Sequence, residues 1–481
     1  MEQTSSVSYP NVLVLRYLRK TGQVAPEVAM KAHGFVNAGY QRLLTFESPT
    51  GGFNWWGNGE AGNVVLTGLG IQQFEEMSKV HEVDRGIIER SRRWLASKQG
   101  QDGSWAKGDS LHSYNAALGS SNLRTTSYIL WSLLQGGDKG PHVEKGIKYL
   151  KSHLGDAKGD LYAQAMAAVA LAHYDPKDKA LAKLIEELAR QKVDDAKTKS
   201  IYWPTKGDTE TYSRGVTAAI ETTALVAMAM IKADTHHSMV NSALGFIVQN
   251  KGAYGNWEST QATILALKAL LAAASGQGAN ADMTVSVLLD GKQLAKERFT
   301  SKNSDILRLI DAGVVQPGTH KVELRSEGKA NVMYQVVGRY YQPWKDARPK
   351  GQEPLTIKLR YDRTRLKVDD LLTANVDVTY HMQRATFMVI VDLGIPPGFA
   401  VQHEDLEALV KRQAITRYST TGRQITLYIG AMYKDKPVRM KYHLKAKFPI
   451  RAKTPRSVAY EYYTPSAKGV QEPVQIVVDQ R

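Results

Sequence analysis

A glycine-rich turn, often with an aromatic residue, recurs at intervals of roughly fifty residues through the first part of this chain. Each turn is followed by an apolar pattern of helical period rich in Ala, Thr and Gly, and then by a more charged amphipathic pattern. Such a helix pair cannot bury its apolar face alone, so successive pairs must stack. With small-residue helices inside and charged helices outside, the repeats predict an α/α toroid. The turns are centred on Gly52, Gly103, Gly155, Gly207 and Gly252.

The repeats predict six inner and five outer helices. A ring of six hairpins needs a sixth outer helix, and the free place for it lies before residue 1. We therefore expect an α6/α6-like ring that is truncated at its amino end, so that the chain is a fragment. The inner helices are expected at about 8–20, 61–78, 122–136, 160–174, 215–232 and 257–273, and the outer ones at about 26–46, 84–99, 142–154, 178–192 and 235–250.

Beyond residue 280 the apolar period changes from helical to two, as in "MTVSVLLDG", "HKVELRSEG" and "FMVIVDLGI". Alternating β-branched and aromatic residues, interrupted by Gly, Pro and Asp, are typical of strands. Boundaries are expected within 274–280 and 344–354, where Gly, Pro and polar residues cluster without periodicity. The sequence therefore predicts a multi-domain chain, with an all-α toroid over 1–275 and two all-β modules over 280–346 and 350–481.

Charge and cysteine content exclude several kinds of site. The formal net charge is +16, but Lys and Arg are spread along the whole chain without a nucleic-acid-binding motif. We interpret this charge as a solvated basic surface and expect no nucleic-acid partner. The 481 residues include no Cys, which excludes disulfides, thiolate metal sites and a cysteine nucleophile within this chain. Zinc-protease, P-loop and nucleophile-elbow motifs are also absent, so we expect no metal and no cofactor.

An α/α toroid can also carry a glycosidase or a terpenoid cyclase, because a fold alone does not decide function. A terpene-cyclase-like repeat, "WLASKQGQDGSW", is present, but the D-x-D-D acid motif of those enzymes is not. A carbohydrate-active enzyme or terpenoid cyclase with β appendages stays open as an alternative. A glycosidase would need paired carboxylates at the mouth of the ring, and the candidates in the turns are Asp109, Asp160, Asp208 and Glu210.

Several features together resemble the C-terminal half of an α2-macroglobulin. They are the opening "MEQTSSVSYPNVLVLRYL", the toroid repeats, the segment "GAYGNWESTQATILALKAL" and the order of toroid and two β modules. The toroid of that family carries the motif C-x-E-Q, in which the Cys thiol is joined to the Gln side-chain carbonyl with loss of ammonia. The resemblance places Glu2 and Gln3 at the E-Q pair and implies that the Cys partner lies immediately before Met1. This chain would then hold only the Gln half of the thioester.

The resemblance covers essentially the whole chain. Residues 280–346 resemble the second part of the CUB domain that brackets the thioester domain. Residues 350–481 resemble the terminal macroglobulin domain, which binds receptors in animal members. The resemblance implies that the helix "HEDLEALVKR" (403–412) is a candidate contact for a receptor or another partner.

The resemblance implies a protease inhibitor and trap with a single-turnover thioester, rather than an enzyme. In the intact protein, proteolysis would expose the thioester, and an amine or hydroxyl of the target protease would attack the Gln3 carbonyl. In hydroxyl-preferring relatives a His on a loop before an inner helix attacks first. His112 lies in such a loop, and Tyr114 or Asn115 could occupy that position instead.

The lack of Cys distinguishes this chain from the disulfide-rich animal members and is similar to bacterial ones. The resemblance to bacterial members implies an extracytoplasmic, complement-like defence protein, either secreted or anchored to a membrane through an upstream lipid. A macroglobulin relative that never forms a thioester and acts as an interaction module stays open as a second alternative.

Overall fold

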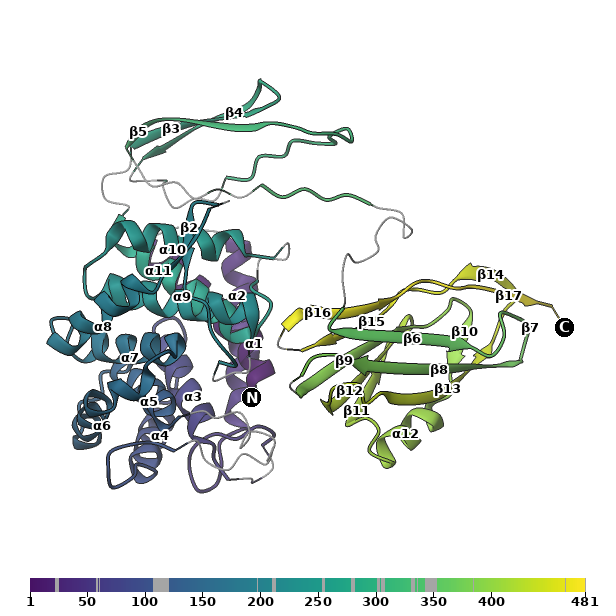
Figure 1. The fold of residues 1–481 in the computed structure, drawn as a ribbon, viewed down its shortest axis with the longest axis horizontal. Coiled ribbons are helices and arrows are strands. Elements are labelled where there is room, and N and C mark those ends of the chain that lie inside the picture. The colour runs from purple at the N-terminus through teal and green to yellow at the C-terminus, as the bar shows by residue number, and fades with distance from the viewer. Residues whose placement is uncertain are drawn as a thin grey trace. The chain divides into compact units, whose positions relative to one another are not determined.

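The computed structural model has two compact units, Met1–Val336 and Val337–Arg481, each with a hydrophobic core of its own (Figure 1). The division of the chain into three segments at 275–280 and 346–350 stays a prediction. The structure describes residues 1–21, 26–57, 59, 61–106, 121–196, 198–209, 213–252, 256–277, 282–300, 303, 308–329, 334, 336–341, 353–383, 385–462 and 464–480.

The helices of the first unit form a closed ring. Each inner helix packs against the next one along the chain, α11 packs against α1, and the outer helices pack behind the inner ones (Figure 1). The predicted α/α toroid is confirmed. The inner helices are α1 (Glu2–Thr21), α3 (Val64–Met77), α5 (Asn122–Gln135), α7 (Leu161–Tyr174), α9 (Gly215–Lys232) and α11 (Thr260–Gln277), and the outer ones are α2 (Pro26–Leu44), α4 (Arg85–Ser97), α6 (Pro141–Ser152), α8 (Lys179–Arg190) and α10 (His237–Gln249).

Short elements fill the connections. A 3₁₀ turn, η2 (Leu154–Ala157), follows α6. A two-stranded antiparallel hairpin, β1 (Val193–Asp195) and β2 (Ser200–Tyr202), connects α8 to the turn before α9.

Helix α1 begins at Glu2, whereas the apolar pattern predicted a start at residue 8. The prediction was wrong because the first turns are polar and show no apolar stripe. Their serines bond back to the backbone: Ser6 Oγ donates to the Gln3 carbonyl at 2.7 Å, and Ser8 Oγ donates to the carbonyl four residues earlier at 2.8 Å. Ser8 also meets Gly39 of α2, where an added Cβ would stand 2.3 Å from the Ser8 Cβ. A glycine is therefore required for α1 and α2 to approach this closely.

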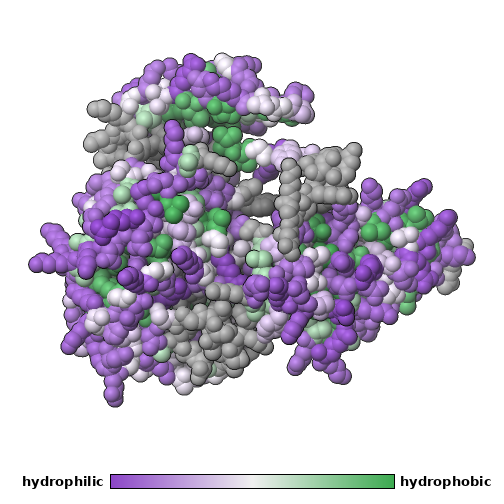
Figure 2. Space-filling model, in the orientation of Figure 1, coloured by the Kyte–Doolittle hydropathy of each residue, from purple (hydrophilic) through white to green (hydrophobic). Residues whose placement is uncertain are grey.

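Side-chain size separates inner from outer helices. All residues of α7 from Tyr162 to Ala172 are buried, and more than half of them are Ala. In contrast, α8 buries one apolar stripe that runs from Leu181 to Leu188. Hydrophilic side chains accordingly cover most of the toroid face seen in Figure 2. Helix α9 has the length and composition of a membrane span, but 78% of it is buried inside the toroid, as in the core helix of a folded domain.

Buried tryptophans in the turns connect consecutive hairpins. In three turns the indole N–H donates to a carbonyl in the last turn of the preceding outer helix. Two of these carbonyls, those of Leu95 and Leu188, also accept from the backbone N–H of the C-cap residue. The Trp backbone N–H donates to a Thr hydroxyl of the following inner helix, so each turn is tied on both sides. The indole bonds are Trp105 to Leu95 (2.7 Å), Trp203 to Leu188 (2.7 Å) and Trp257 to Ile247 (2.6 Å), and the backbone bonds run to Thr126 (2.9 Å), Thr223 (3.1 Å) and Thr263 (3.0 Å).

A three-stranded antiparallel sheet of order β4-β3-β5 follows the toroid. The β3–β4 hairpin turns through Asp290 and Gly291, whose φ values of 50° and 82° are typical of a two-residue type I′ turn. His320 Nδ1 lies 2.6 Å from Asp290 Oδ2, which fixes this turn from outside the hairpin. Apolar side chains gather on one face of the sheet (Figure 2). The strands are β3 (Asp282–Leu289), β4 (Lys292–Thr300) and β5 (Val322–Lys329).

The second unit is a β-sandwich, so the predicted terminal all-β module is confirmed. A four-stranded sheet of order β10-β13-β8-β6 and a five-stranded sheet of order β11-β12-β9-β15-β16 enclose the core, and a small sheet of order β14-β17-β7 adjoins them. Helix α12 (His403–Lys411) packs against β13 and β11 and buries Leu406 and Leu409. The strands are β6 (Leu355–Tyr361), β7 (Arg365–Lys367), β8 (Leu371–Tyr380), β9 (Thr386–Gly394), β10 (Phe399–Val401), β11 (Arg417–Thr420), β12 (Gln424–Met432), β13 (Val438–Ala446), β14 (Ile450–Lys453), β15 (Ser457–Glu461), β16 (Thr464–Gln471) and β17 (Gln475–Asp479).

Replacing Trp203 with Phe should lower the free energy of unfolding by about 2–4 kcal/mol. The Leu188 carbonyl would lose one of its two donors and keep the Gln191 N–H, and the smaller ring would leave a void. Urea unfolding followed by circular dichroism measures this change. Trp56→Phe, at a side chain that is 53% exposed, is the matched control and should change stability by less than about 0.5 kcal/mol. Equal effects of the two substitutions would contradict the structural role of the turn tryptophans.

The Asp290–His320 pair should give a defined pH dependence. The hydrogen bond to Asp290 raises the pKa of His320 above 6.5, and His320 lowers the pKa of Asp290 below 3.8. The His320 contribution is complete below pH 6.5 and is lost as the pH rises through its raised pKa. The Asp290 contribution is complete above pH 3.8 and is lost as the pH falls through its lowered pKa. The pair therefore stabilises the turn most between these two values.

An NMR titration should place the pKa of His320 above 6.5, and Asp290→Asn should bring it back toward that value. Asp311→Asn removes a carboxylate of the same segment that caps the Gly313 N–H, and it serves as the control. A His320 pKa that is the same in the Asp290→Asn variant would show that the pair does not form in solution.

Candidate functional site

The first turn of α1 lies against the aromatic turn that precedes α3. Met1 is 5% exposed and packs opposite Gly70, where an added Cβ would stand 3.2 Å from Met1 Cε and 2.9 Å from the Phe53 ring. The Met1 amino group donates to the Trp55 carbonyl at 2.8 Å, and the Met1 carbonyl accepts from the Ser5 N–H at 3.1 Å. Burial lowers the pKa of this amino group to about 5. Met1 at the start of α1 is therefore packed against the aromatic turn.

The structure places the predicted acyl donor, Gln3, in this first turn with its side chain exposed to solvent. Glu2 beside it is half-buried. The predicted loop residues, His112, Tyr114 and Asn115, lie outside the described residues, so their relation to Gln3 stays a prediction.

The amino ends of the inner helices meet at one end of the ring, the mouth, where charged side chains link them. Arg124 at the start of α5 donates from Nε to Asp160, the N-cap of α7, at 2.8 Å, and from Nη1 to the Asp208 carbonyl at 2.7 Å. Its guanidinium lies 5.2 Å from the centroid of the Tyr162 ring. Arg214, the N-cap of α9, pairs with the Asp208 carboxylate. Asp160 and Asp208 are thus engaged as a helix cap and as arginine partners.

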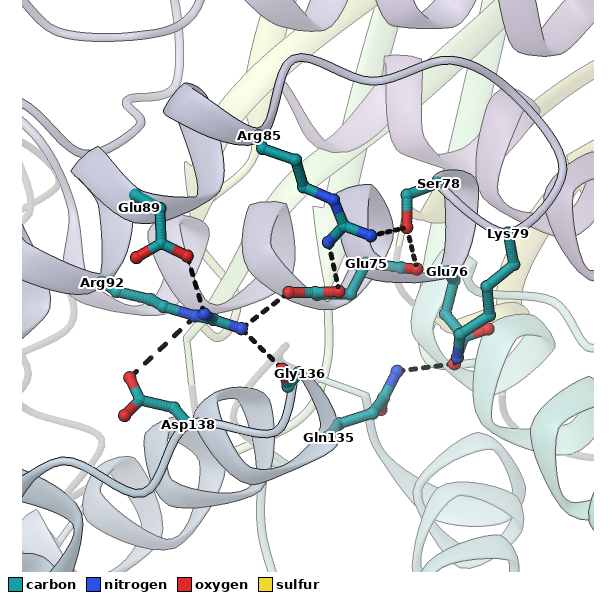
Figure 3. Close-up of polar contacts among 10 residues, drawn as sticks. All are labelled: Glu75, Glu76, Ser78, Lys79, Arg85, Glu89, Arg92, Gln135, Gly136 and Asp138. Carbon is teal, nitrogen blue, oxygen red and sulfur yellow. Dashed lines mark hydrogen bonds and ion pairs between the residues drawn. The ribbon is translucent and has the colours of Figure 1, made fainter.

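The carboxyl end of α3 carries two adjacent buried glutamates at the opposite end of the ring, and Figure 3 shows their surroundings. Glu75 accepts from Arg92 Nη2 at 2.7 Å and from Arg85 Nη1 at 3.1 Å. Arg92 also donates to the Gly136 carbonyl at 2.6 Å, which connects outer helix α4 to the end of α5. These arginines neutralise the Glu75 carboxylate and orient the ends of α3, α4 and α5.

The second glutamate, Glu76, connects α1, α3 and α5. It pairs with Arg16 of α1. It also pairs with Lys79 at 3.3 Å and accepts from Gln135 Nε2 at 2.8 Å (Figure 3). Arg19 of α1 also donates to the Lys79 carbonyl. Because the carboxyl ends of α1 and α3 meet here, their amino ends point together toward the mouth.

A fully buried lysine on α11, Lys268, lies among three other inner helices. Its Nζ donates to Gln72 Oε1 of α3 at 2.6 Å and to Gln135 Oε1 of α5 at 3.1 Å. It also lies 4.5 Å from the Trp131 ring centroid and 5.2 Å from that of Tyr9 in α1. Burial lowers the pKa of Lys268 to about 7.

The sequence analysis missed the cluster formed by Glu75, Glu76 and Lys268. The available signal was a pair of acids in the inner-helix pattern "GIQQFEEM" and a lone lysine in "ATILALKALLAA". Among the described residues, no group of three or more His, Asp or Glu is placed to hold a metal ion. The first turn of α1 is therefore the candidate reactive centre, and the buried cluster supports the ring around it.

Comparison with known families and proteins gives matches along the whole chain. The model described as the A-macroglobulin TED domain matches residues 1–272, and the model described as the A-macroglobulin receptor binding domain matches residues 384–473. Ovostatin of Gallus gallus is 25% identical over 495 aligned residues, which cover 98% of this chain and 32% of that protein. Thioester-containing protein 1 allele R1 of Anopheles gambiae is 26% identical over 487 residues, which cover 98% of this chain and 34% of that protein. The chain thus spans about a third of the length of these curated relatives.

Solved structures of bacterial α2-macroglobulins share this fold. Salmonella α2-macroglobulin reacted with methylamine superposes with a TM-score of 0.65 at 16% identity, covering 99% of this chain and 30% of that one. Native Escherichia coli α2-macroglobulin, from domain MG7 to the C-terminus, gives a TM-score of 0.63 at 16% identity, covering 99% of this chain and 72% of that one. The TED-domain match covers more than half of the 481 residues, and the protein therefore belongs to the α-macroglobulin family.

Proposed function

We propose that this chain is the C-terminal part of a protease-trapping macroglobulin in which Gln3 forms a thioester with a cysteine immediately before Met1. Formation would join the Cys sulfur to Gln3 Cδ with loss of ammonia. A lysine amine or a hydroxyl of the trapped protease would then attack Cδ, and the thiolate would leave. The reaction occurs once per molecule, so the protein would act as an inhibitor and not as a turnover enzyme.

The observation that carries this proposal is the position of Gln3 in the first turn of an inner helix. Residues three apart on a helix lie on one face, so a residue before Met1 that continued α1 would lie beside Gln3. The Met1 carbonyl already accepts the Ser5 N–H at 3.1 Å, which is the first bond of that helical path.

Because Gln3 is exposed, we infer that other parts of the intact protein shield the thioester. A thioester persists only while water and amines are kept from its carbonyl. Since the Gln3 side chain is exposed in this chain, other segments of the intact protein would have to cover it until a protease cuts the upstream segment that serves as its bait. In that arrangement His112, Tyr114 or Asn115 would decide whether amines or hydroxyls are the preferred targets.

The terminal domain is proposed as a further contact surface. The helix at 403–412 was the predicted contact, and its first turn is acidic, with Glu404 and Asp405. Beside its end lies an open pocket of about 650 Å³ that contains Arg412 together with polar residues of β6, β8 and β13. We propose that a partner binds here and contacts both the acidic helix and the basic pocket. We also propose that the protein is extracytoplasmic, either secreted or anchored through an upstream lipid.

Methylamine uptake tests the thioester. The reading frame extended upstream should supply a Cys directly before Met1, and the extended protein should incorporate one methylamine and release one thiol. Mass spectrometry and a thiol assay measure the two events. Absence of that Cys, or of uptake by a folded protein that has it, would leave a macroglobulin without thioester chemistry that acts by interaction alone.

Replacing Gln3 with Ala in the extended protein should abolish methylamine uptake with little effect on folding. The side chain is exposed in a helix, so the free energy of unfolding should change by less than about 0.5 kcal/mol. Gln101→Ala, at an exposed glutamine in a turn of the same domain, should retain full uptake. Equal uptake by the Gln3→Ala variant and the unmodified protein would exclude Gln3 as the acyl donor.

A further inference from the structure

The environment of Lys268 has the components of an amide-forming reaction. Its Nζ lies 2.6 Å from Gln72 Oε1 and 3.1 Å from Gln135 Oε1, so a primary amine meets two carboxamides inside the ring. Rings of Trp131 and Tyr9 enclose it at 4.5 and 5.2 Å. These contacts hold the amine in place in a largely buried position.

Burial favours the nucleophilic form of this amine. Desolvation lowers the pKa of Lys268 to about 7, whereas Glu76 acts in the opposite direction. A substantial fraction of the amine is therefore neutral near pH 7 and carries a free lone pair. An exposed lysine, with a pKa near 10.4, carries almost none at that pH.

The two carboxamides differ in what holds their nitrogen. Gln135 Nε2 donates to the Glu76 carboxylate at 2.8 Å (Figure 3), so a proton acceptor touches its leaving group. Gln72 Nε2 donates to the Ser132 hydroxyl at 2.9 Å. That hydroxyl is itself committed as a donor to a backbone carbonyl of α5 at 2.8 Å. The Gln135 carboxamide therefore contacts both the Lys268 amine and the Glu76 carboxylate, whereas the Gln72 carboxamide contacts only the amine.

We propose that Lys268 and Gln135 form an intramolecular isopeptide bond. Lys268 Nζ attacks Gln135 Cδ, and a new C–N bond forms. A proton passes from Nζ to Nε2 by way of the Glu76 carboxylate, which Nε2 contacts, the C–Nε2 bond breaks, and ammonia leaves. Amine and carboxamide give a secondary amide and ammonia, with no change of oxidation state. Positioned groups of this kind reach effective molarities of about 10⁵–10⁸ M, so no enzyme is needed.

The bond would connect helices that are not neighbours in the ring. α5 packs between α3 and α7, and α11 packs between α9 and α1, so the Lys268–Gln135 bond crosses the ring rather than following it. It also closes a covalent loop over residues 135–268. The inference is independent of the thioester at Gln3 and holds in a chain that has no Cys.

Intact-mass spectrometry of the purified 481-residue chain tests the proposal. The expected mass is lower than that of the sequence by one ammonia, and thioester formation cannot cause this loss because the chain contains no Cys. Fragmentation of a protease digest should identify one branched peptide joining Lys268 and Gln135. On denaturing gels the chain should migrate faster than its Lys268→Arg variant, because the internal loop keeps it compact.

Variants separate the roles of the residues. Lys268→Arg keeps a buried cation but cannot form this bond, and its mass should equal that of its sequence. Glu76→Gln should slow bond formation by roughly 10²-fold or more, since the proton carrier is lost. Gln72→Met should retain the bond and is the matched control. Circular dichroism confirms that each variant is folded before its mass is compared.

Three results would overturn the assignment. An intact mass equal to that of the sequence would exclude the bond in the native protein. A branched peptide at Gln72 would show that the hydrogen bond between Gln135 and Glu76 does not select the acceptor. Equal rates in folded Glu76→Gln and in the unmodified chain would exclude Glu76 as the proton carrier.

Discussion

The bonds of the turn tryptophans determine how one hairpin follows the next around the ring. An outer helix ends with carbonyls that have no partner within the helix, and burying them without a donor would be costly. The indoles of Trp105, Trp203 and Trp257 donate to such carbonyls from the following turn, and at Leu95 and Leu188 they add to a bond from the C-cap N–H. The same residues bond through the backbone to threonines of the next inner helix. Each tie thus sets the position of an inner helix relative to the outer helix before it.

The ties explain why small residues can fill the inner helices. Alanine side chains, as in α7, supply little contact area each, so α7 depends on close approach to its neighbours. Helices can approach this closely only if each one is fixed in a single position, and the tryptophan bonds fix the inner helices in this way. The buried ion pairs of Glu75 and Glu76 likewise fix the positions of the helices at the far end of the ring, because a misplaced helix would leave a buried charge unpaired.

The ring, the order of its helices and the terminal β-sandwich were predictable because they depend on local periodicity, which a single sequence contains. The start of α1 was not predictable, since residues 2–7 carry no apolar stripe and the helix there packs on α2. The surroundings of Lys268 were not predictable either. Its partner Gln72 is 196 positions away in the sequence, and only ring closure brings them together.

The candidate reactive centre at the start of α1 was predictable only through the resemblance to the macroglobulin family. Glu2 and Gln3 form no pattern by themselves, and the physical reason to single them out is their place in the first turn of an inner helix. The loop residues His112, Tyr114 and Asn115 depend on a segment between Trp105 and Asn122 whose conformation follows from no periodicity. Their assignment therefore rests on the distance from the motif alone.

The common direction of the inner helices has an electrostatic consequence for the whole ring. Helix dipoles aligned side by side repel one another, with excess positive charge at the amino ends and negative charge at the carboxyl ends. The chain places Asp160, Asp208 and Glu258 at the amino ends, and Arg16, Lys79 and Arg92 at the carboxyl ends. These side chains offset the field at both ends. The carboxylates at the mouth therefore reduce the positive field that the starts of the inner helices would otherwise present to an anion there.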